Sequence, residues 1–261
     1  MKFTRMGLQS AFLFLTVFKG VEIACQIDNG LGATPGRFPY QVFITQDGEY
    51  ICGGGIIDAI HVITSAHCVA EDPRYELAVI AGAIHLNDNN AVNRSVNRIH
   101  VHPYYFSPHI GPHAIGGNPS TNDIAVLTLI SPFRWENRIR PMVLPTNTVE
   151  ATDFECIVCY FAGLGRIGQL SPHSRLLQYI VMKILTAREC SRWQHAPAVN
   201  EFCAQDIFVA ASGLEGDSGG AIVCNDVVVG IFKGSDERPG YPQIFTSVYA
   251  YLDFINMARE N

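Results

Sequence analysis

Three short strings of this sequence contain, in chain order, a histidine, an aspartate and a serine. The strings are Ser65-Ala66-His67-Cys68, Thr121-Asn122-Asp123-Ile124-Ala125 and Gly216-Asp217-Ser218-Gly219-Gly220. A serine hydroxyl is a poor nucleophile at neutral pH, so it needs an imidazole to take its proton and a carboxylate to orient that imidazole. Each string alone has a structural explanation, but the three together indicate nucleophilic acyl transfer.

Short β-rich runs bounded by Gly, Pro, Asn and Asp would carry these strings. The predicted strands cover residues 40–44, 55–65, 77–81, 124–129, 156–162, 176–184, 221–224, 227–232 and 243–247. Apolar residues at helical spacing occur only at residues 247–259, which predicts one C-terminal helix. The pattern is typical of an all-β fold, either barrels or a sandwich. A long Gly/Pro-rich loop at residues 108–120 leads into the aspartate string, and loops of that length are usually functional or mobile.

Composition limits the class of protein. The chain has 261 residues, of which 48% are hydrophobic and 16% charged. It can therefore bury a large core and is not intrinsically disordered. The formal net charge of -6 comes with no basic run, which argues against nucleic acid or an anionic membrane surface as the main partner.

The N-terminus has the layout of a secretory signal peptide. Lys2 and Arg5 precede a short apolar stretch, and small residues follow it. The stretch is too short to span a bilayer, and a buried N-terminal helix is the alternative explanation. We predict a signal peptide at residues 1–24, a stub at residues 25–26 and one domain at residues 27–261. The mature protein would be secreted and have no membrane span.

Eight cysteines in a secreted chain predict disulfides rather than metal ligands. Cys156 and Cys159 form one C-x-x-C pair, but no second pair lies at zinc-site spacing. A glycosylation sequon begins at Asn93, beside an Asn-rich segment that we expect to be an exposed loop; the sequon leaves open whether a glycan is attached.

In their order, and in a secreted β-rich chain, the three strings resemble the chymotrypsin/trypsin family of serine proteases. The resemblance runs from Ile27 to the final helix. It includes Ile27-Asp28-Asn29-Gly30, Phe38-Pro39-Tyr40-Gln41-Val42 and Cys52-Gly53-Gly54-Gly55-Ile56-Ile57. It implies two six-stranded antiparallel β-barrels with a C-terminal α-helix and an active site between the barrels. The string Gly220-Ala221-Ile222-Val223-Cys224 also resembles insect members of the family.

The resemblance assigns a role to each catalytic residue. His67 would be the general base, Asp123 would orient and stabilise it, and Ser218 would be the nucleophile. The backbone N–H groups of Gly216 and Ser218 would form the oxyanion hole.

The resemblance also implies activation by a freed N-terminus. The amine of Ile27 would form an ion pair with Asp217 and so shape the oxyanion hole. The residue before Ile27 is Gln26 rather than Arg or Lys. We therefore expect a zymogen activated by a non-tryptic or aminopeptidase step.

Six of the cysteines match family pairs. The resemblance implies disulfides between Cys52 and Cys68, Cys159 and Cys224, and Cys190 and Cys203. Cys25 and Cys156 match no usual pair; they either join each other, which we favour, or bond another chain.

Two residues of the expected substrate pocket argue against trypsin-like specificity. Ser212 stands where trypsin-like members carry an aspartate on the pocket floor, so the charge that binds Lys or Arg is missing. Gln243 stands where a wall glycine is common and would narrow or block the pocket. Small or medium uncharged side chains are therefore the expected substrates.

Two further departures concern the strand beside the site and the metal. The family's Ser-Trp-Gly substrate strand is replaced by Phe232-Lys233-Gly234-Ser235, and the sequence does not fix its alignment. Lys233 either lies near the triad carboxylate or points to solvent. The carboxylate that opens the family's calcium loop is missing, because Ala83 follows Gly82, so we expect no metal and no cofactor.

These features predict a secreted, extracellular serine endopeptidase. Its partners would be protein or peptide substrates and protein protease inhibitors, and we expect a monomer. The alternative is a catalytically weak or inactive homologue that acts as a binding or regulatory protein in a proteolytic cascade. A lipase-like hydrolase does not fit, because that family orders its triad serine, acid, histidine.

Overall fold

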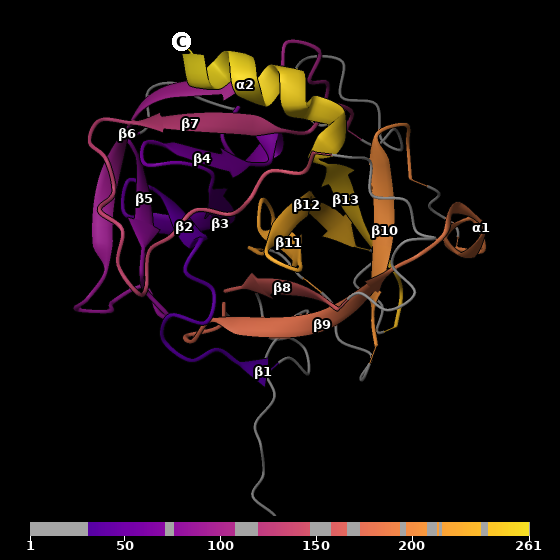
Figure 1. The fold of residues 1–261 in the computed structure, drawn as a ribbon, viewed down its shortest axis with the longest axis horizontal. Helices are drawn as coiled ribbons and strands as arrows, with labels where there is room; N and C mark the ends of the chain where they lie inside the picture. Colours follow the sequence, from indigo (N-terminus) through magenta and orange to yellow (C-terminus); the bar gives the residue numbers. More distant parts are fainter. Residues whose placement is uncertain are drawn as a thin grey trace, which may run out of the picture.

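The structure is a computed structural model with two β-barrels side by side (Figure 1). It describes residues 31–70, 76–107, 120–146, 158–165, 173–193, 197–207, 213, 216–235 and 240–260. The expected signal peptide and stub, residues 108–119 and Ser212 lie outside these segments, so the predictions made for them stay predictions.

The first barrel is a closed ring of antiparallel strands in the order β2-β3-β4-β7-β6-β5. The strands are β2 (Gln41–Gln46), β3 (Glu49–Ile56), β4 (His61–Thr64), β5 (Leu77–Ala81), β6 (Val92–Val101) and β7 (Ala125–Leu129). Alternation of side chains fills the interior, because successive residues of a strand face opposite sides. In β5, for example, Leu77, Val79 and Ala81 are buried in the barrel core.

The second barrel is built from β8 (Cys159–Gly163), β9 (Gln178–Ile184), β10 (Glu201–Asp206), β11 (Ala221–Cys224), β12 (Val227–Ser235) and β13 (Gln243–Ser247). The order is β9-β10-β13-β12-β11-β8, and pairing of β8 with β9 closes the ring. The short β1 (Leu31–Gly32) adds to β9 outside this ring. Three phenylalanines, Phe161, Phe232 and Phe245, pack against one another in its core.

A third cluster of apolar side chains joins the two barrels to the C-terminal helix. Ile63 and Val126 from the first barrel meet Ile231 from the second, and α2 (Leu252–Glu260) contributes Phe254 and Ile255. All five side chains are buried. Each contributes about 1.5–3 kcal/mol of hydrophobic free energy relative to an exposed state, so the contact between the barrels is part of the core.

The fold confirms the expected two-barrel class and the C-terminal helix. The predicted strands at residues 77–81, 221–224 and 243–247 match β5, β11 and β13. The predicted single strand at 55–65 is wrong: it contains the end of β3, a turn and β4. Asp58 makes that turn, because its carboxylate accepts hydrogen bonds from the amides of Ile60 and His61.

Several elements were not predicted from the sequence, among them β6, β10 and α1 (Ala187–Cys190). Strands β6 and β10 are rich in polar residues. They are defined by hydrogen bonding to neighbouring strands and not by an apolar run in the sequence. Asn93 is an exposed residue of β6, and the Asn-rich segment before it, residues 87–90, lies outside the strands and is mostly exposed, as expected. The one-turn helix α1 begins with a capping box between Thr186 and Glu189.

Helix α2 is fastened to the first barrel by a polar cluster. Arg259 Nε donates to Asp58 Oδ2 at 2.7 Å, and His61 Nδ1 lies 2.8 Å from Asp58 Oδ1. Partial burial alone would raise the pKa of Asp58, but hydrogen bonds from Arg259, the Ile60 amide and His61 outweigh it and lower the pKa below its ordinary value. The ionised carboxylate therefore stabilises the fold.

Replacing this carboxylate should loosen the helix. Asp58→Asn is expected to lower Tm at pH 7 by about 2–4 °C, the change that about 1 kcal/mol makes in a domain of this size. Because the pKa of Asp58 is lowered by folding, its contribution is complete above the unfolded value of about 3.9 and is lost as pH falls through the folded value.

Thermal unfolding from pH 7 to pH 3 measures this dependence, with the exposed Glu76→Gln as the matched control. The gap between Asp58→Asn and the parent should close in acid while the control stays with the parent throughout. A gap of constant size would show that the carboxylate charge contributes nothing.

Candidate active site

His67 and Asp123 come together because of the pairing of two strands. In the first barrel β4 and β7 are antiparallel, with Thr64 opposite Ala125. The residues just after β4 therefore meet those just before β7. His67 Nδ1 lies 2.7 Å from Asp123 Oδ2, and the His67 backbone N–H donates to Asp123 Oδ1 at 2.9 Å. Two bonds thus fix the imidazole relative to the carboxylate.

Asp123 remains ionised although it is only 1% exposed. Burial, the largest single influence, raises the pKa of its carboxyl. Hydrogen bonds and charge from His67, with the nearby charge of Lys233, outweigh burial and lower the pKa below its ordinary value. The hydroxyl of Ser120 also donates to Asp123 Oδ2, at 3.3 Å. The carboxylate can therefore hold one imidazole tautomer and stabilise a protonated ring.

Ser218 lies in the loop before β11 and is tied to both barrels. Its carbonyl accepts from the Gly53 N–H at 2.8 Å, on β3 of the first barrel. The next residue, Gly219, donates to the Phe232 carbonyl at 2.9 Å, which also accepts from the Ser65 hydroxyl at 3.0 Å. These bonds hold the serine segment beside the strand that leads to His67.

Only glycine fits directly after Ser218. Gly219 has φ +77°, and a Cβ there would lie 2.1 Å from Thr64 Oγ1 and 2.5 Å from the Gly53 carbonyl oxygen. The glycine thus permits the close approach of the two barrels at the site. Within the described residues, Ser218 Oγ forms no hydrogen bond with His67; catalytic hydrogen bonds often tighten only when substrate is bound.

A tyrosine that sequence analysis missed holds the expected oxyanion-hole glycine. Gly216 has φ +95°, and its carbonyl accepts a hydrogen bond from Tyr50 Oη at 2.5 Å. Burial and then the charge of Asp217 raise the pKa of Tyr50 well above its ordinary value, so its phenol stays a neutral donor. The ring of His173 packs edge-on against Tyr50 at 5.5 Å. These contacts orient the peptide next to Ser218.

The expected activation carboxylate is buried among glycines. Asp217 is 1% exposed, and its Oδ1 accepts from the Gly165 N–H at 2.7 Å. A Cβ on Gly163 would lie 1.9 Å from that oxygen, and one on Gly165 would lie 2.2 Å from Oδ2. The glycines make room for the carboxylate. Its expected partner Ile27 lies outside the described residues.

Gln243 lies on β13 beside the expected pocket. Its side chain is fully buried, and Oε1 accepts from the Gly213 N–H at 3.1 Å, one residue after Ser212. Ser235 donates to the Gly213 carbonyl at 2.7 Å. The Nε2 group of Gln243 is buried without a hydrogen-bond partner in the described part of the chain.

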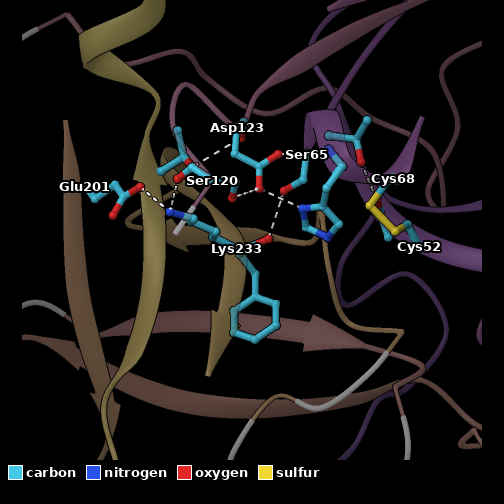
Figure 2. Close-up of polar contacts among 12 residues, drawn as sticks. Cys52, Ser65, Cys68, Ser120, Asp123, Glu201 and Lys233 are labelled. Carbon is cyan, nitrogen blue, oxygen red and sulfur yellow. Dashed lines mark hydrogen bonds and ion pairs between the residues drawn. A yellow bond between two sulfur atoms is a disulfide. The ribbon is translucent and has the colours of Figure 1, made fainter. Parts of the chain in front are cut away.

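Lys233 turns inward, towards Asp123, at a bulge between Phe232 and Gly234. Its ammonium is bonded to Glu201 and to the Ser120 carbonyl (Figure 2). The bulge settles the alignment that the sequence left open: Phe232 keeps its side chain in the barrel core. No motif marked Ser120 or Glu201, because their role arises only from the meeting of three chain segments.

The three disulfides implied by the resemblance are present: Cys52–Cys68, Cys159–Cys224 and Cys190–Cys203. The first disulfide links β3 to the residue after His67 (Figure 2). Cys52, His67 and Cys68 are close enough together to suggest a metal cluster, but both sulfurs are in the disulfide and offer no thiolate. Cys25 and Cys156 lie outside the described residues, so their pairing stays a prediction.

Comparison with known proteins agrees with this geometry. The family model described as Trypsin matches residues 27–255. The chain belongs to the trypsin family of serine proteases. Granzyme B of Rattus norvegicus is 28% identical over 240 residues, covering 89% of this chain and 90% of the relative. Chymotrypsin-2 of Vespa crabro is 30% identical over 231 residues, covering 88% and 98%.

A solved structure shares the fold of this trypsin-family chain. The structure of neuropsin, a serine protease expressed in the limbic system of mouse brain, matches with a TM-score of 0.76 at 22% identity, covering 88% of this chain and 98% of that one. The protein is therefore a serine-type endopeptidase by family. No helix in the described segments of the protease is long and apolar enough to cross a membrane.

The hydrogen bond from Tyr50 should matter for turnover. Tyr50→Phe leaves the Gly216 carbonyl without its donor, and we expect kcat to fall about tenfold, the effect of about 1.4 kcal/mol. KM should change little, because the lost bond orients a group that acts in the transition state. Steady-state kinetics on a peptide substrate measure both constants.

The matched control is Tyr179→Phe, a buried tyrosine packed against Phe38. It should keep the parent kcat. If Tyr50→Phe also kept it, the tyrosine would only fill space.

Proposed function

We propose that this protease is a secreted endopeptidase that cleaves peptide bonds through His67, Asp123 and Ser218. The observation that carries the proposal is the 2.7 Å contact between His67 Nδ1 and the buried carboxylate of Asp123. It supports the proposal because a buried, ionised partner is what a catalytic imidazole needs. The packing of the Ser218 loop against the strand before His67 supports Ser218 as the nucleophile.

In the first step, His67 Nε2 would take the proton of the Ser218 hydroxyl as Oγ attacks the substrate carbonyl carbon. The C–Oγ bond forms, and the carbonyl π electrons move to oxygen, which would be bound by the N–H groups of Gly216 and Ser218. Asp123 would stabilise the imidazolium. The C–N bond then breaks, and the amine leaves with the proton from His67.

In the second step, water would replace the amine. His67 takes a proton from the water molecule as the water oxygen attacks the acyl carbon. The second oxyanion is bound by the same N–H groups. Collapse breaks the C–Oγ bond, and Ser218 regains its proton from His67. The acid product leaves, and no metal or cofactor is needed at any step.

We propose that the primary specificity is not trypsin-like. Ser212 would leave the pocket floor without a charge, and the buried amide of Gln243, bonded beside it to Gly213, would shorten the pocket. Small or medium uncharged side chains fit such a pocket. The same filled wall is the observation that favours the alternative, a binding or regulatory homologue that cleaves little.

Secretion and activation are also part of the proposal. Residues 1–24 would direct secretion to the extracellular space and be removed, and the mature enzyme would begin at Ile27, whose amine would pair with Asp217. The buried setting of the Asp217 carboxylate supports this pair. The exposed Asn93 could accept a glycan. We expect a monomer that protein protease inhibitors can block.

The nucleophile can be tested by covalent labelling. Ser218→Ala should lose peptidase activity and labelling by a fluorophosphonate while its Tm stays near that of the parent, because the half-buried hydroxyl has no packing role. The exposed Ser191→Ala is the matched control and should label fully.

The labelled parent also shows at which residue the active chain begins. N-terminal sequencing of the labelled chain should give Ile27. Absence of label from a chain that begins at Ile27 would shift the proposal to the binding or regulatory homologue, and labelling of Ser218→Ala would refute the nucleophile.

The pocket wall can be tested by shortening Gln243. Gln243→Gly should increase kcat/KM for substrates with a large aromatic residue before the cut by about tenfold or more, because the pocket gains the volume of the side chain. A peptide library with every residue at that position measures the change. Strong preference of the parent for Arg or Lys, or an unchanged profile in the variant, would contradict the assignment.

A further inference from the structure

Lys233 and Glu201 form a charge pair buried beside the candidate active site. Lys233 Nζ lies 2.6 Å from Glu201 Oε1, and the two side chains are only 10% and 6% exposed. Ion pairs on a protein surface contribute little, but a pair withdrawn from water must be well compensated or it destabilises the fold. Glu201 is compensated further, since its Oε2 accepts from the Ala198 N–H at 2.9 Å.

We propose that the Lys233–Glu201 pair positions and electrostatically balances the carboxylate of Asp123 during catalysis. The inference rests on the proposed function. It assigns a positioning role to two residues outside the triad, neither of which contacts the imidazole.

The first part of the argument is connectivity. Lys233 Nζ donates to the Ser120 carbonyl at 2.5 Å, and the Ser120 hydroxyl donates to Asp123 Oδ2 at 3.3 Å, the oxygen that His67 also contacts. Figure 2 shows the continuous line of contacts from Glu201 through Lys233 and Ser120 to Asp123. The ammonium thus fixes the residue whose hydroxyl helps to orient the carboxylate.

The strand that carries Glu201 is also linked to the backbone of Asp123. Glu201 lies on β10 opposite Thr246 of β13, and the Thr246 hydroxyl donates to the Asp123 carbonyl at 3.2 Å. Strands β10, β12 and β13 of the second barrel therefore all converge on the aspartate that precedes β7 of the first barrel.

The second part of the argument is charge. A lone ammonium beside Asp123 would offset part of the negative charge of the carboxylate. The carboxylate would then stabilise the imidazolium less, and catalysis would be weaker. Glu201 cancels that ammonium and leaves the net negative charge of Asp123 available to His67. A further ionisable group among the described residues here is Tyr251. Burial outweighs a hydrogen bond with Asn200 and raises the pKa of its phenol, and the charges of Glu201 and Asp123 raise it further.

His102 packs edge-on against Tyr251 at 5.1 Å. Burial lowers its pKa, so at neutral pH it adds no positive charge to the cluster. Among the residues that the structure describes, the ionisable groups around the Asp123–His67 couple are therefore Lys233, Glu201 and a neutral phenol.

The test measures the titration of His67 by NMR of histidine-labelled protein, with His67→Gln to assign the resonance. Glu201→Gln should lower the pH at which the His67 ring titrates by about half a unit or more, because one positive charge is left uncompensated. The neutral double variant Lys233→Met/Glu201→Gln should return it to about the parent value. The exposed control Glu260→Gln should not move it.

Kinetics on the same proteins separate positioning from bulk stability. Glu201→Gln should lower kcat about tenfold with KM within about twofold. The double variant should recover only part of kcat, since Ser120 has lost its donor. Lys183→Met, which removes a surface lysine 50% exposed and 3.9 Å from Glu189, should match the parent.

Two results would overturn the inference: an unchanged His67 titration in Glu201→Gln, or a parent-level kcat in the double variant. A fall in Tm with no shift in titration is a case of the first result, and it would mean that the pair only stabilises the fold. If Glu201→Gln fails to fold, the kcat of the double variant decides. If the parent takes no fluorophosphonate label, the proposed function fails, and the titration still decides the charge relation.

Discussion

The structure depends on keeping one carboxylate ionised between two barrels. Asp123 is cut off from water, so every oxygen of its carboxylate must be satisfied by the protein. His67 supplies two hydrogen bonds from the first barrel and Ser120 a third. Thr246 binds its backbone carbonyl from the second barrel. The packing that places these groups is the apolar cluster shared by both barrels and α2.

At the serine loop the barrels approach closely because glycines line their contact there. Gly219 sits against Thr64 and the Gly53 carbonyl with no room for a Cβ. A backbone hydrogen bond from Gly53 to Ser218 then holds the serine loop on the first barrel. A larger residue in the loop would push Ser218 away from Gly53, so the position of Ser218 and the packing of the barrels are a single constraint.

Sequence predicted the elements that have strong local signals. The apolar strands β5, β11 and β13 and the helix α2 were found from their apolar runs and periodicity. The three disulfides were found because the family resemblance implied their pairing. Polar strands such as β6 and β10 were missed, because only their neighbours define them. Tyr50, Ser120 and Glu201 were missed for a similar reason. Tyr50 bonds to Gly216, 166 positions away, and Ser120 and Glu201 are joined by Lys233, at a bulge that composition does not reveal.

The central claim is that the two barrels assemble one nucleophilic site. A crystal structure of the protein treated with a fluorophosphonate tests it most directly. The account predicts a bond from phosphorus to Ser218 Oγ and a phosphoryl oxygen about 2.7–3.1 Å from the N–H groups of Gly216 and Ser218. The contact between His67 and Asp123 should remain. An unmodified Ser218, or a phosphoryl oxygen turned away from both N–H groups, would contradict it.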